Sequence, residues 1–218
     1  MLKARLRAIA NYINKRDNAV DIGADHGYLG IYLVQNHLVN SIILTDIKKS
    51  ALDVARRNVE ASSLNIPLIL TDGLNGVDTA KINTVIISGM GTSTILQILN
   101  NPVKMQSINK LVLQSNNDLF LLRKEVIKLG FSLIDETTVY ENGFWYVVCL
   151  FEKTKIRMLT DKELKYGLVK EDKKEYYLYL LNRVEEILKN MEESTNENKK
   201  AELLTTKEEL SQLIIEKK

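Results

Sequence analysis

The sequence contains few of the residues that cross-link, interrupt or anchor a chain. The single cysteine, Cys149, excludes an internal disulfide framework and fits a reducing compartment. Two prolines and ten glycines leave little material for long disordered linkers. No apolar run approaches about eighteen residues, the length that suggests a membrane-spanning helix. We therefore expect a cytoplasmic protein with no membrane segment.

Strong net charge and metal-ligand spacings are also missing. The formal net charge is +2, so only the distribution of charge can point to a polyanionic partner. One cysteine and two distant histidines give no spacing typical of a metal site, and we expect no metal. The first sixteen residues, however, show helical spacing and carry five basic residues and no acidic one, namely Lys3, Arg5, Arg7, Lys15 and Arg16.

Short apolar strands alternate with helices up to about Lys153. The predicted strands cover 19–22, 41–46, 67–72, 83–89 and 110–115, and the predicted helices cover 1–16, 28–37, 48–64, 92–100 and 118–129. Asn117 or Asp118 is expected to cap the last of these helices. Two longer strands, 131–141 and 144–153, are joined by Glu141-Asn142-Gly143, a sequence typical of a tight turn.

This alternation predicts an α/β fold. Strands separated by helices form a parallel sheet with both faces covered, and their unbroken apolar runs fit burial on two sides. The two longer strands are expected to form an antiparallel hairpin at the edge of the sheet. Seven strands closing with such a hairpin resemble the Rossmann-like sheet of the class I methyltransferases.

After Lys153 the pattern changes, because glycine almost disappears and apolar residues recur at helical spacing. Two such segments, 176–191 and 201–215, flank the polar stretch 192–200. We predict a coiled-coil-like helical hairpin over residues 154–218, separate from a first domain over residues 1–153. Its equal numbers of acidic and basic residues make direct phosphate binding by the hairpin a weaker expectation.

Acidic residues stand at the ends of three successive predicted strands. In a doubly wound sheet, ligands bind outside the carboxyl ends of the strands. Asp46, twenty-five positions after Asp21, is placed to accept hydrogen bonds from a ribose diol, and Asp72 could meet an adenine amino group. A solvated loop aspartate is the alternative for any one of them. The predicted nucleotide site comprises Asp21, Gly23, Asp46, Ile47, Asp72, Gly73, Ser88 and Gly89.

The first loop of this site is acidic, since Asp25 stands where many nucleotide-binding loops have glycine. A carboxylate there would repel the pyrophosphate of a dinucleotide, and no phosphate-binding lysine motif follows. S-adenosyl-L-methionine has no phosphate and carries a sulfonium and an ammonium group. We therefore predict S-adenosyl-L-methionine as the cofactor, because carboxylates attract it.

Three stretches, "DIGADHGYLGIYLV", "SGMGTSTILQIL" and "LVLQSNNDLFLLRKEVIKLGF", resemble the TrmK family of bacterial methyltransferases. The resemblance implies methylation of N1 of the adenine at tRNA position 22, in the D-loop region, by a catalytic domain over residues 1–153. It also implies cofactor binding by Asp21, Gly23, Asp46, Asp72 and Gly89. The sequence departs from the family pattern at Gly30 and, near the active site, at Thr92 and Ser115.

Adenine N1 has an in-plane lone pair and needs no deprotonation, so alignment is the main task of such an enzyme. Asp25 and His26 project from the first loop, and either could stabilise the cationic product or accept its proton. Tyr28 could stack on a flipped base. A capping or packing role is the alternative for His26 and Tyr28.

The target base and the body of the substrate need further contacts. Met90 and Gly91 could hold the base, and Asn116 could bond its edge, although a turn or cap is the alternative for Asn116. Basic faces suit a polyanion, and the candidates are Arg5 on the first helix, Arg56 and Arg57 on another, and Arg123, Lys124 and Lys128 on a third.

Three alternatives stay open at this point. One is a class I methyltransferase for another RNA, a protein or a small molecule. The second is a non-catalytic RNA-binding module built from the basic helix and the C-terminal hairpin. The third is a nicotinamide oxidoreductase, which the acidic first loop disfavours. A tRNA partner and a monomer are the preferred expectations.

Overall fold

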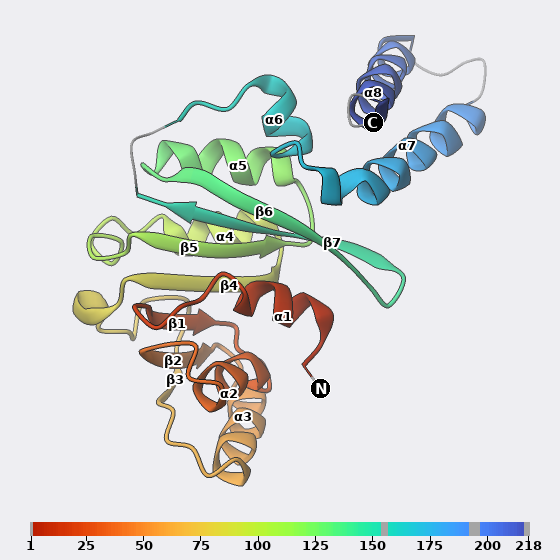
Figure 1. Ribbon diagram of the computed structural model, residues 1–218. Helices are drawn as coiled ribbons and strands as arrows, with labels where there is room; N and C mark the ends of the chain where they lie inside the picture. The colour runs from red at the N-terminus through yellow and green to blue at the C-terminus, as the bar shows by residue number, and fades with distance from the viewer. Residues whose placement is uncertain (1, 154–156, 192–196, 216–218) are drawn as a thin grey trace. The chain divides into compact units, whose positions relative to one another are not determined.

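The computed structural model describes residues 2–153, 157–191 and 197–215, and they contain a seven-stranded mixed sheet (Figure 1). The strand order is β3-β2-β1-β4-β5-β7-β6. The strands are β1 (Asn18–Ile22), β2 (Ser41–Asp46), β3 (Leu68–Leu70), β4 (Thr84–Met90), β5 (Lys110–Ser115), β6 (Ser132–Glu141) and β7 (Phe144–Glu152). The predicted seven-stranded α/β fold is confirmed.

The strand order reverses between β1 and β4, and this reversal places the helices on two faces. From β1 the chain crosses to β2 and β3, whereas from β4 it crosses in the opposite direction to β5. Because parallel crossovers are right-handed, the two sets of helices cover opposite faces. One set is α2 (Tyr28–Gln35) and α3 (Lys49–Ala61), and the other is α4 (Thr92–Leu99) and α5 (Leu119–Lys128). A short 3-10 helix, η1 (Thr79–Lys81), precedes β4.

The edge hairpin was predictable in detail. β7 pairs antiparallel with both β5 and β6, and a two-residue turn, Asn142-Gly143, joins β6 to β7. Both turn residues have positive φ, 52° and 86°, as an Asn-Gly turn of a two-residue hairpin requires. On α5, Asp118 is the N-cap, because its side chain accepts a hydrogen bond from the Leu121 amide.

The N-terminal helix is shorter than its sequence pattern predicts. α1 spans Ala4–Ala10 and not residues 1–16, and the chain then turns toward β1. Ala8, Ile9 and Ala10 are buried in the core that α1, α2 and the sheet share. Ile13, which the pattern places on the same helix, is also buried, but from the turn that follows. Apolar residues can be buried from a helix or from a turn, so their spacing predicted a helix that is longer than the one in the structure.

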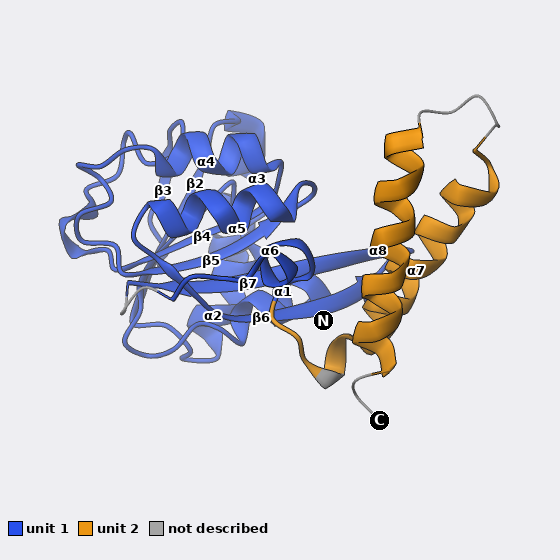
Figure 2. Cartoon of the chain, turned by 90° about the horizontal axis from the view of Figure 1, so that it is seen from above, with its two compact units in different colours: residues 1–167 blue, residues 168–218 orange. Residues whose placement is uncertain are grey.

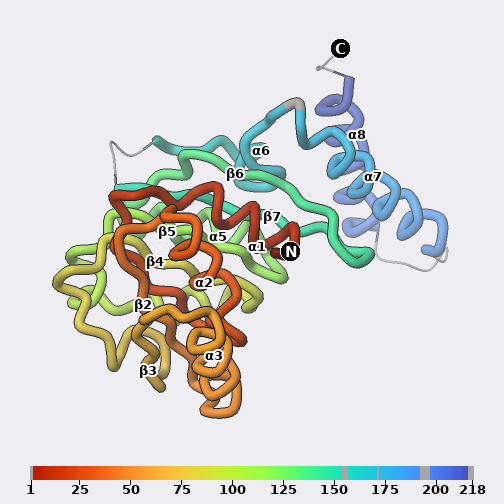
Figure 3. Tube along the Cα trace, turned by 60° about the horizontal axis from the view of Figure 1, so that its bottom comes forward, coloured from red at the N-terminus to blue at the C-terminus, as the bar shows by residue number. Residues whose placement is uncertain are grey.

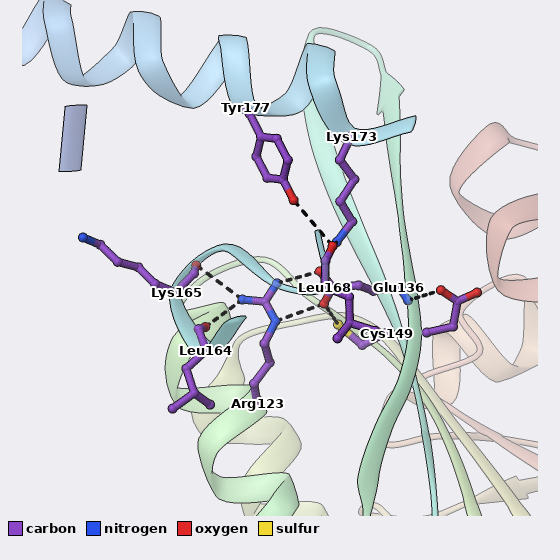
Figure 4. A network of polar contacts seen from close by, with 9 residues as sticks. Arg123, Glu136, Cys149, Leu164, Lys165, Leu168, Lys173 and Tyr177 are labelled. Carbon is purple, nitrogen blue, oxygen red and sulfur yellow. Dashed lines mark hydrogen bonds and ion pairs between the residues drawn. The ribbon is translucent and has the colours of Figure 1, made fainter. Parts of the chain in front are cut away.

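A buried ion pair joins α5 to the edge strand β6 (Figure 4). Arg123 Nε lies 3.0 Å from Glu136 Oε2, and the two side chains are 1% and 0% exposed. The Arg123 guanidinium also donates to the main-chain carbonyl of Leu164, at the end of α6 (Asp161–Tyr166). The prediction that Arg123 lies on an exposed basic face is therefore wrong, because its charge is matched inside the protein.

Glycine 167 ends α6 directly over this pair. Its φ is +80°, and a Cβ there would collide with the Glu136 carboxylate and approach Arg123 Nη2 to 2.8 Å. Glycine is therefore the residue that lets the chain pass so close to the ion pair. Since α6 packs on α5, residues up to Gly167 belong to the same compact unit as the sheet.

The chain forms two compact units, residues 1–167 and 168–218 (Figure 2). The sequence predicted the boundary between the two domains after Lys153. The next residues, 154–156, lie outside the described residues. The second unit contains η2 (Glu171–Lys173), α7 (Lys174–Lys189) and α8 (Glu197–Ile215). α7 packs against α8, with an ion pair of 2.9 Å between Glu185 Oε1 and Lys207 Nζ, as a helical hairpin requires. Part of the predicted polar connection, 192–196, is outside the described residues.

Within the second unit, the start of α7 is fixed from inside (Figure 4). The buried Lys173 donates from Nζ to the Leu168 carbonyl at 2.8 Å, and the Tyr177 hydroxyl lies 3.5 Å from the same oxygen. Of the helices that the structure describes, none has the length and apolar character of a membrane span.

The buried pair gives a stability prediction. Arg123→Met leaves the Glu136 carboxylate buried without its guanidinium, so we expect the free energy of unfolding to fall by about 3–5 kcal/mol. Urea unfolding followed by the fluorescence of Trp145, the one tryptophan of the chain, measures this change.

The matched control is Lys128→Met on the same helix. Lys128 pairs with Glu125 at 2.7 Å but is 59% exposed. We expect its removal to cost less than about 1 kcal/mol. Equal losses in the two variants would mean that the Arg123–Glu136 pair contributes no more than a surface pair.

Candidate active site

A cavity of about 580 Å³ opens at the carboxyl ends of the parallel strands, at the point where the strand order reverses. This is where a doubly wound sheet binds ligands, and the volume suits a small molecule. All eight residues predicted to bind the cofactor line it: Asp21, Gly23, Asp46, Ile47, Asp72, Gly73, Ser88 and Gly89. The structure therefore brings together the ends of β1, β2 and β4 and the loop after β3.

The Asp46 carboxylate is held rigidly at the end of β2. Its Oδ2 accepts a hydrogen bond from the Asp25 amide at 3.1 Å, and its Oδ1 accepts one from the Lys48 amide at 2.8 Å. Two hydrogen bonds from backbone amides hold this carboxylate in position. Because one amide comes from the first loop, Asp46 also fixes the conformation of that loop.

Asp21 lies beside this charge and is almost completely buried. Burial, and secondarily the negative charge of Asp46, raise the pKa of the Asp21 carboxyl from 3.8 to about 7. Both effects disfavour the ionised form in the absence of a nearby cation. A cationic ligand would reverse them, so the site has an electrostatic preference for positive charge.

The first loop reaches the cavity through two unusual backbone conformations. Gly23 has φ +73°, and a Cβ there would collide with the methyl group of Met90, which lies directly against it. Asp25 also has positive φ, 50°, a conformation that aspartate tolerates better than most residues. The loop can therefore carry a carboxylate where a glycine is common, without losing its shape.

The predicted catalytic residues Asp25, His26 and Tyr28 also line the cavity. His26 Nε2 lies 3.6 Å from Asp25 Oδ1, and the His26 ring meets the Tyr28 ring edge-on at a centroid distance of 5.8 Å. The alternative that His26 caps α2 is not what the structure has, because the N-cap is Gly27, without a side-chain cap. Tyr28 is half exposed, at 52%, and its ring is accessible from the cavity.

A buried glutamine that the sequence analysis did not select organises the far wall. Gln114, on β5, is fully buried, and its Oε1 accepts hydrogen bonds from Arg5 Nη1 at 2.7 Å and from the Gly89 amide at 3.0 Å. Its Nε2 donates to Asn116 Oδ1 at 3.1 Å, and Asn116 Nδ2 donates to the Gly89 carbonyl at 2.8 Å. A polar residue directly after the apolar run 111–113 of this strand was the available signal.

The predicted substrate residues divide into two groups. Arg5 and Met90 line the cavity, and Asn116 is tied to the Gly89 loop beside it. Gly91 begins α4 as its N-cap and does not line the cavity. Arg56 and Arg57 lie exposed on α3 and do not line it either, so any contact they make with a substrate is outside the cavity.

Several further residues that line the cavity are not among the predicted site residues. Lys3 and Leu6 extend the wall along α1, and Thr71 and Ile98 close it beside Gly73. No group of three or more potential metal ligands comes together among the described residues. The arrangement therefore offers a polar end with buried carboxylates, an apolar flank at Ile47, and one wall that reaches a basic helix.

Known proteins resemble this chain along its length. A family model described as a methyltransferase domain matches residues 2–149. The tRNA (adenine(22)-N(1))-methyltransferase of Bacillus subtilis is 34% identical over 154 residues, which are 69% of this chain and 65% of that protein, slightly under two thirds of its length. The structure of M. capricolum TrmK with S-adenosyl-homocysteine is 29% identical with a TM-score of 0.84 and covers 100% of both chains. B. subtilis TrmK is 26% identical with a TM-score of 0.81, covering 98% of this chain and 99% of that one.

The raised pKa of Asp21 predicts how ligand affinity depends on pH. A cation beside Asp21 lowers its pKa, so binding releases a proton below about pH 7 and affinity rises with pH until the free site is ionised. We expect the affinity for S-adenosyl-L-methionine to rise about tenfold from pH 6 to pH 8 and to level off above it. Calorimetry at each pH measures it.

Asp21→Asn is the control, because it keeps the shape of the side chain and removes its titration. Any titration of the ligand itself is common to both proteins, so the difference between them isolates Asp21. A wild-type pH dependence that persists unchanged in Asp21→Asn would show that another group is responsible.

Proposed function

This chain belongs to the TrmK family of class I methyltransferases, and we propose that it methylates N1 of adenine 22 in tRNA with S-adenosyl-L-methionine as the methyl donor. The observation that carries the proposal is the pairing of Asp21 and Asp46 in the cavity at the switch of strand order. A nucleotide site with buried carboxylates suits a nucleoside that carries positive charge and no phosphate.

The residues present fit such a donor. Asp46, fixed by two amides at the end of β2, would accept hydrogen bonds from the ribose hydroxyls, and Asp72 would face the adenine. Ile47, 63% exposed in the cavity, offers an apolar surface for the base. Asp21 and the Gly23 loop would hold the charged end. When bound, S-adenosyl-L-methionine supplies an electrophilic methyl group.

The protein's contribution to the reaction is alignment and electrostatics. The lone pair of adenine N1 must point along the line of transfer, and the base has to leave its stack before it can do so. Tyr28 and Met90, on two sides of the cavity, would hold the exposed base. Methylation gives the ring a positive charge, which the Asp25 carboxylate would stabilise until a proton leaves the amino group. His26 would accept that proton.

Asn116 and Gln114 would position the loop against which the base lies. Gln114 accepts from the Gly89 amide, and Asn116 donates to the Gly89 carbonyl, so both ends of this glycine are fixed. We assign Gln114 a positioning role, because it acts through Gly89 and Arg5. The basic residues of α1 would contact the phosphates of the tRNA.

The direct test of the function is methyl transfer. Incubated with labelled S-adenosyl-L-methionine and an unmodified tRNA transcript, the protein should place label in the RNA, and nucleoside analysis should identify it as 1-methyladenosine. A transcript with guanine at position 22 should stay unlabelled. Asp46→Ala should weaken donor binding at least tenfold, since it removes a charge-assisted acceptor.

Two results would contradict the proposed function. Label that appears as 1-methyladenosine at another position would move the target site. Label that appears only in protein or in small molecules would remove tRNA as the substrate, while saturable donor binding would still support a methyltransferase.

The positioning role of Gln114 gives a separate prediction. Gln114→Leu leaves the Arg5 guanidinium and the Gly89 amide without their acceptor. We expect turnover to fall about tenfold to a hundredfold, because misplacing the loop disturbs alignment. The donor dissociation constant, measured by calorimetry, should change less than about threefold, since Gln114 does not line the cavity.

Gln114→Glu is the conservative variant, because it keeps an accepting oxygen for Arg5 and Gly89 and loses only the donor to Asn116. It should retain more turnover than Gln114→Leu. A loss of donor affinity as large as the loss of turnover, in a variant that unfolds like the wild type, would contradict a positioning role.

A further inference from the structure

The tip of the edge hairpin, residues 139–146, is rich in exposed aromatic side chains. Tyr140, Phe144, Trp145 and Tyr146 make up half of its eight residues. Phe144 is 63% exposed and Tyr140 is 59% exposed, although such residues are normally buried. The tip belongs to no part of the cavity, and the mechanism does not use it.

The register places this tip on the same side of the molecule as the cavity. β7 pairs with β5 up to Val148, which lies opposite Gln114, one residue before β5 ends. Residues 144–146 therefore extend past the carboxyl end of β5 as a two-stranded ribbon, by about 10 Å. Figures 1 and 3 show the hairpin projecting beyond the sheet beside α1.

The two faces of the tip carry different residues. Tyr140 pairs with Trp145, and their rings lie 5.4 Å apart on one face. Val139 pairs with Tyr146 and Glu141 with Phe144 on the other face, because side chains alternate along a strand. Val139 packs against the core that includes α1, so the face with Tyr146 and Phe144 is turned toward that helix.

α1 supplies positive charge next to this face. The Arg5 guanidinium lies 5.2 Å from the centre of the Tyr146 ring, while its Nη1 bonds Gln114 in the wall of the site. Lys3, the N-cap of this helix, is exposed and lines the cavity. Glu141 is the one acidic residue of the tip. Aromatic rings beside basic side chains are the combination that binds unpaired nucleotides.

We infer that Phe144 and Tyr146, with Arg5 of α1 and Lys3 just before it, form a surface that grips the nucleic acid next to the target base. Phe144 offers a stacking platform for an unpaired base, and the α1 side chains contact the neighbouring phosphates. Charge complementarity selects an RNA partner over a second copy of this chain or an apolar segment of another protein. The inference rests on the proposed function for the identity of the RNA.

The test compares variants on the two faces of the same tip. Phe144→Ala should raise the KM for the tRNA about tenfold, which is the effect of losing one base stack. Its dissociation constant for S-adenosyl-L-methionine should stay within about twofold, because Phe144 is outside the cavity. Tyr140→Ala, with nearly equal exposure on the opposite face, should leave the KM within about twofold.

Four outcomes would overturn the inference or the function. An unchanged KM for Phe144→Ala, with active wild-type enzyme, would remove the surface and leave the function intact. Equal effects of both variants would show that the tip acts through its stability. A change of oligomeric state in Phe144→Ala, with unchanged KM, would identify a protein contact. Wild-type protein that methylates no tRNA would reject the proposed function itself.

Discussion

The closeness of two carboxylates, those of Asp21 and Asp46, is the constraint on which the rest of the site depends. They end neighbouring parallel strands, so the pairing of β1 with β2 sets their separation. Two backbone amides hold the Asp46 carboxylate in place, and burial beside it raises the pKa of Asp21 to about 7. Full ionisation of the two neighbouring carboxyl groups is disfavoured until a cation binds beside them. The Asp25 amide also binds the first loop to Asp46, so the electrostatics and the shape of the site have one origin.

Sequence patterns predicted the parts of this protein that depend on local chemistry. The Asn142-Gly143 turn follows from two residues that tolerate positive φ, and the end of β2 at Asp46 follows from an apolar run that stops at an aspartate. What the patterns missed depends on distant partners. From the sequence, Arg123 is one of several basic residues on a helix. In the structure it is buried in an ion pair with Glu136, which lies on another element. Gln114 became significant only when the structure placed Arg5, Gly89 and Asn116 around it. Helical spacing also predicted a first helix that is longer than α1, because the apolar residues in the buried turn after α1 follow the same periodicity.

Thr92 and Ser115, two positions at which the sequence departs from the TrmK pattern, contact each other. Their hydroxyl oxygens lie 2.8 Å apart, one at the start of α4 and the other at the end of β5. Both hydroxyls also lie within hydrogen-bond distance of the Asn117 carbonyl, and the Thr92 amide donates to Asn117 Oδ1 at 2.8 Å. The pair thus builds a hydrogen-bonded link between the loops after β4 and β5. Because Asn116 lies within this link, the Thr92 and Ser115 hydroxyls help to fix its position.

Arg5 connects the wall of the cavity, which we assign to the methyl donor, with the edge hairpin, which we assign to the tRNA. Its guanidinium lies at the cavity wall, bonds Gln114 beneath the Gly89 loop, and faces the ring of Tyr146 on the hairpin. The short length of α1 makes this possible, because Ala8, Ile9 and Ala10 fix the helix in the core while its first turn stays at the mouth of the site. A cationic donor at the carboxylates and a polyanion at the hairpin would therefore share one wall. Because Gln114 holds this wall in place, a rigid fold can align two molecules in a single line of transfer.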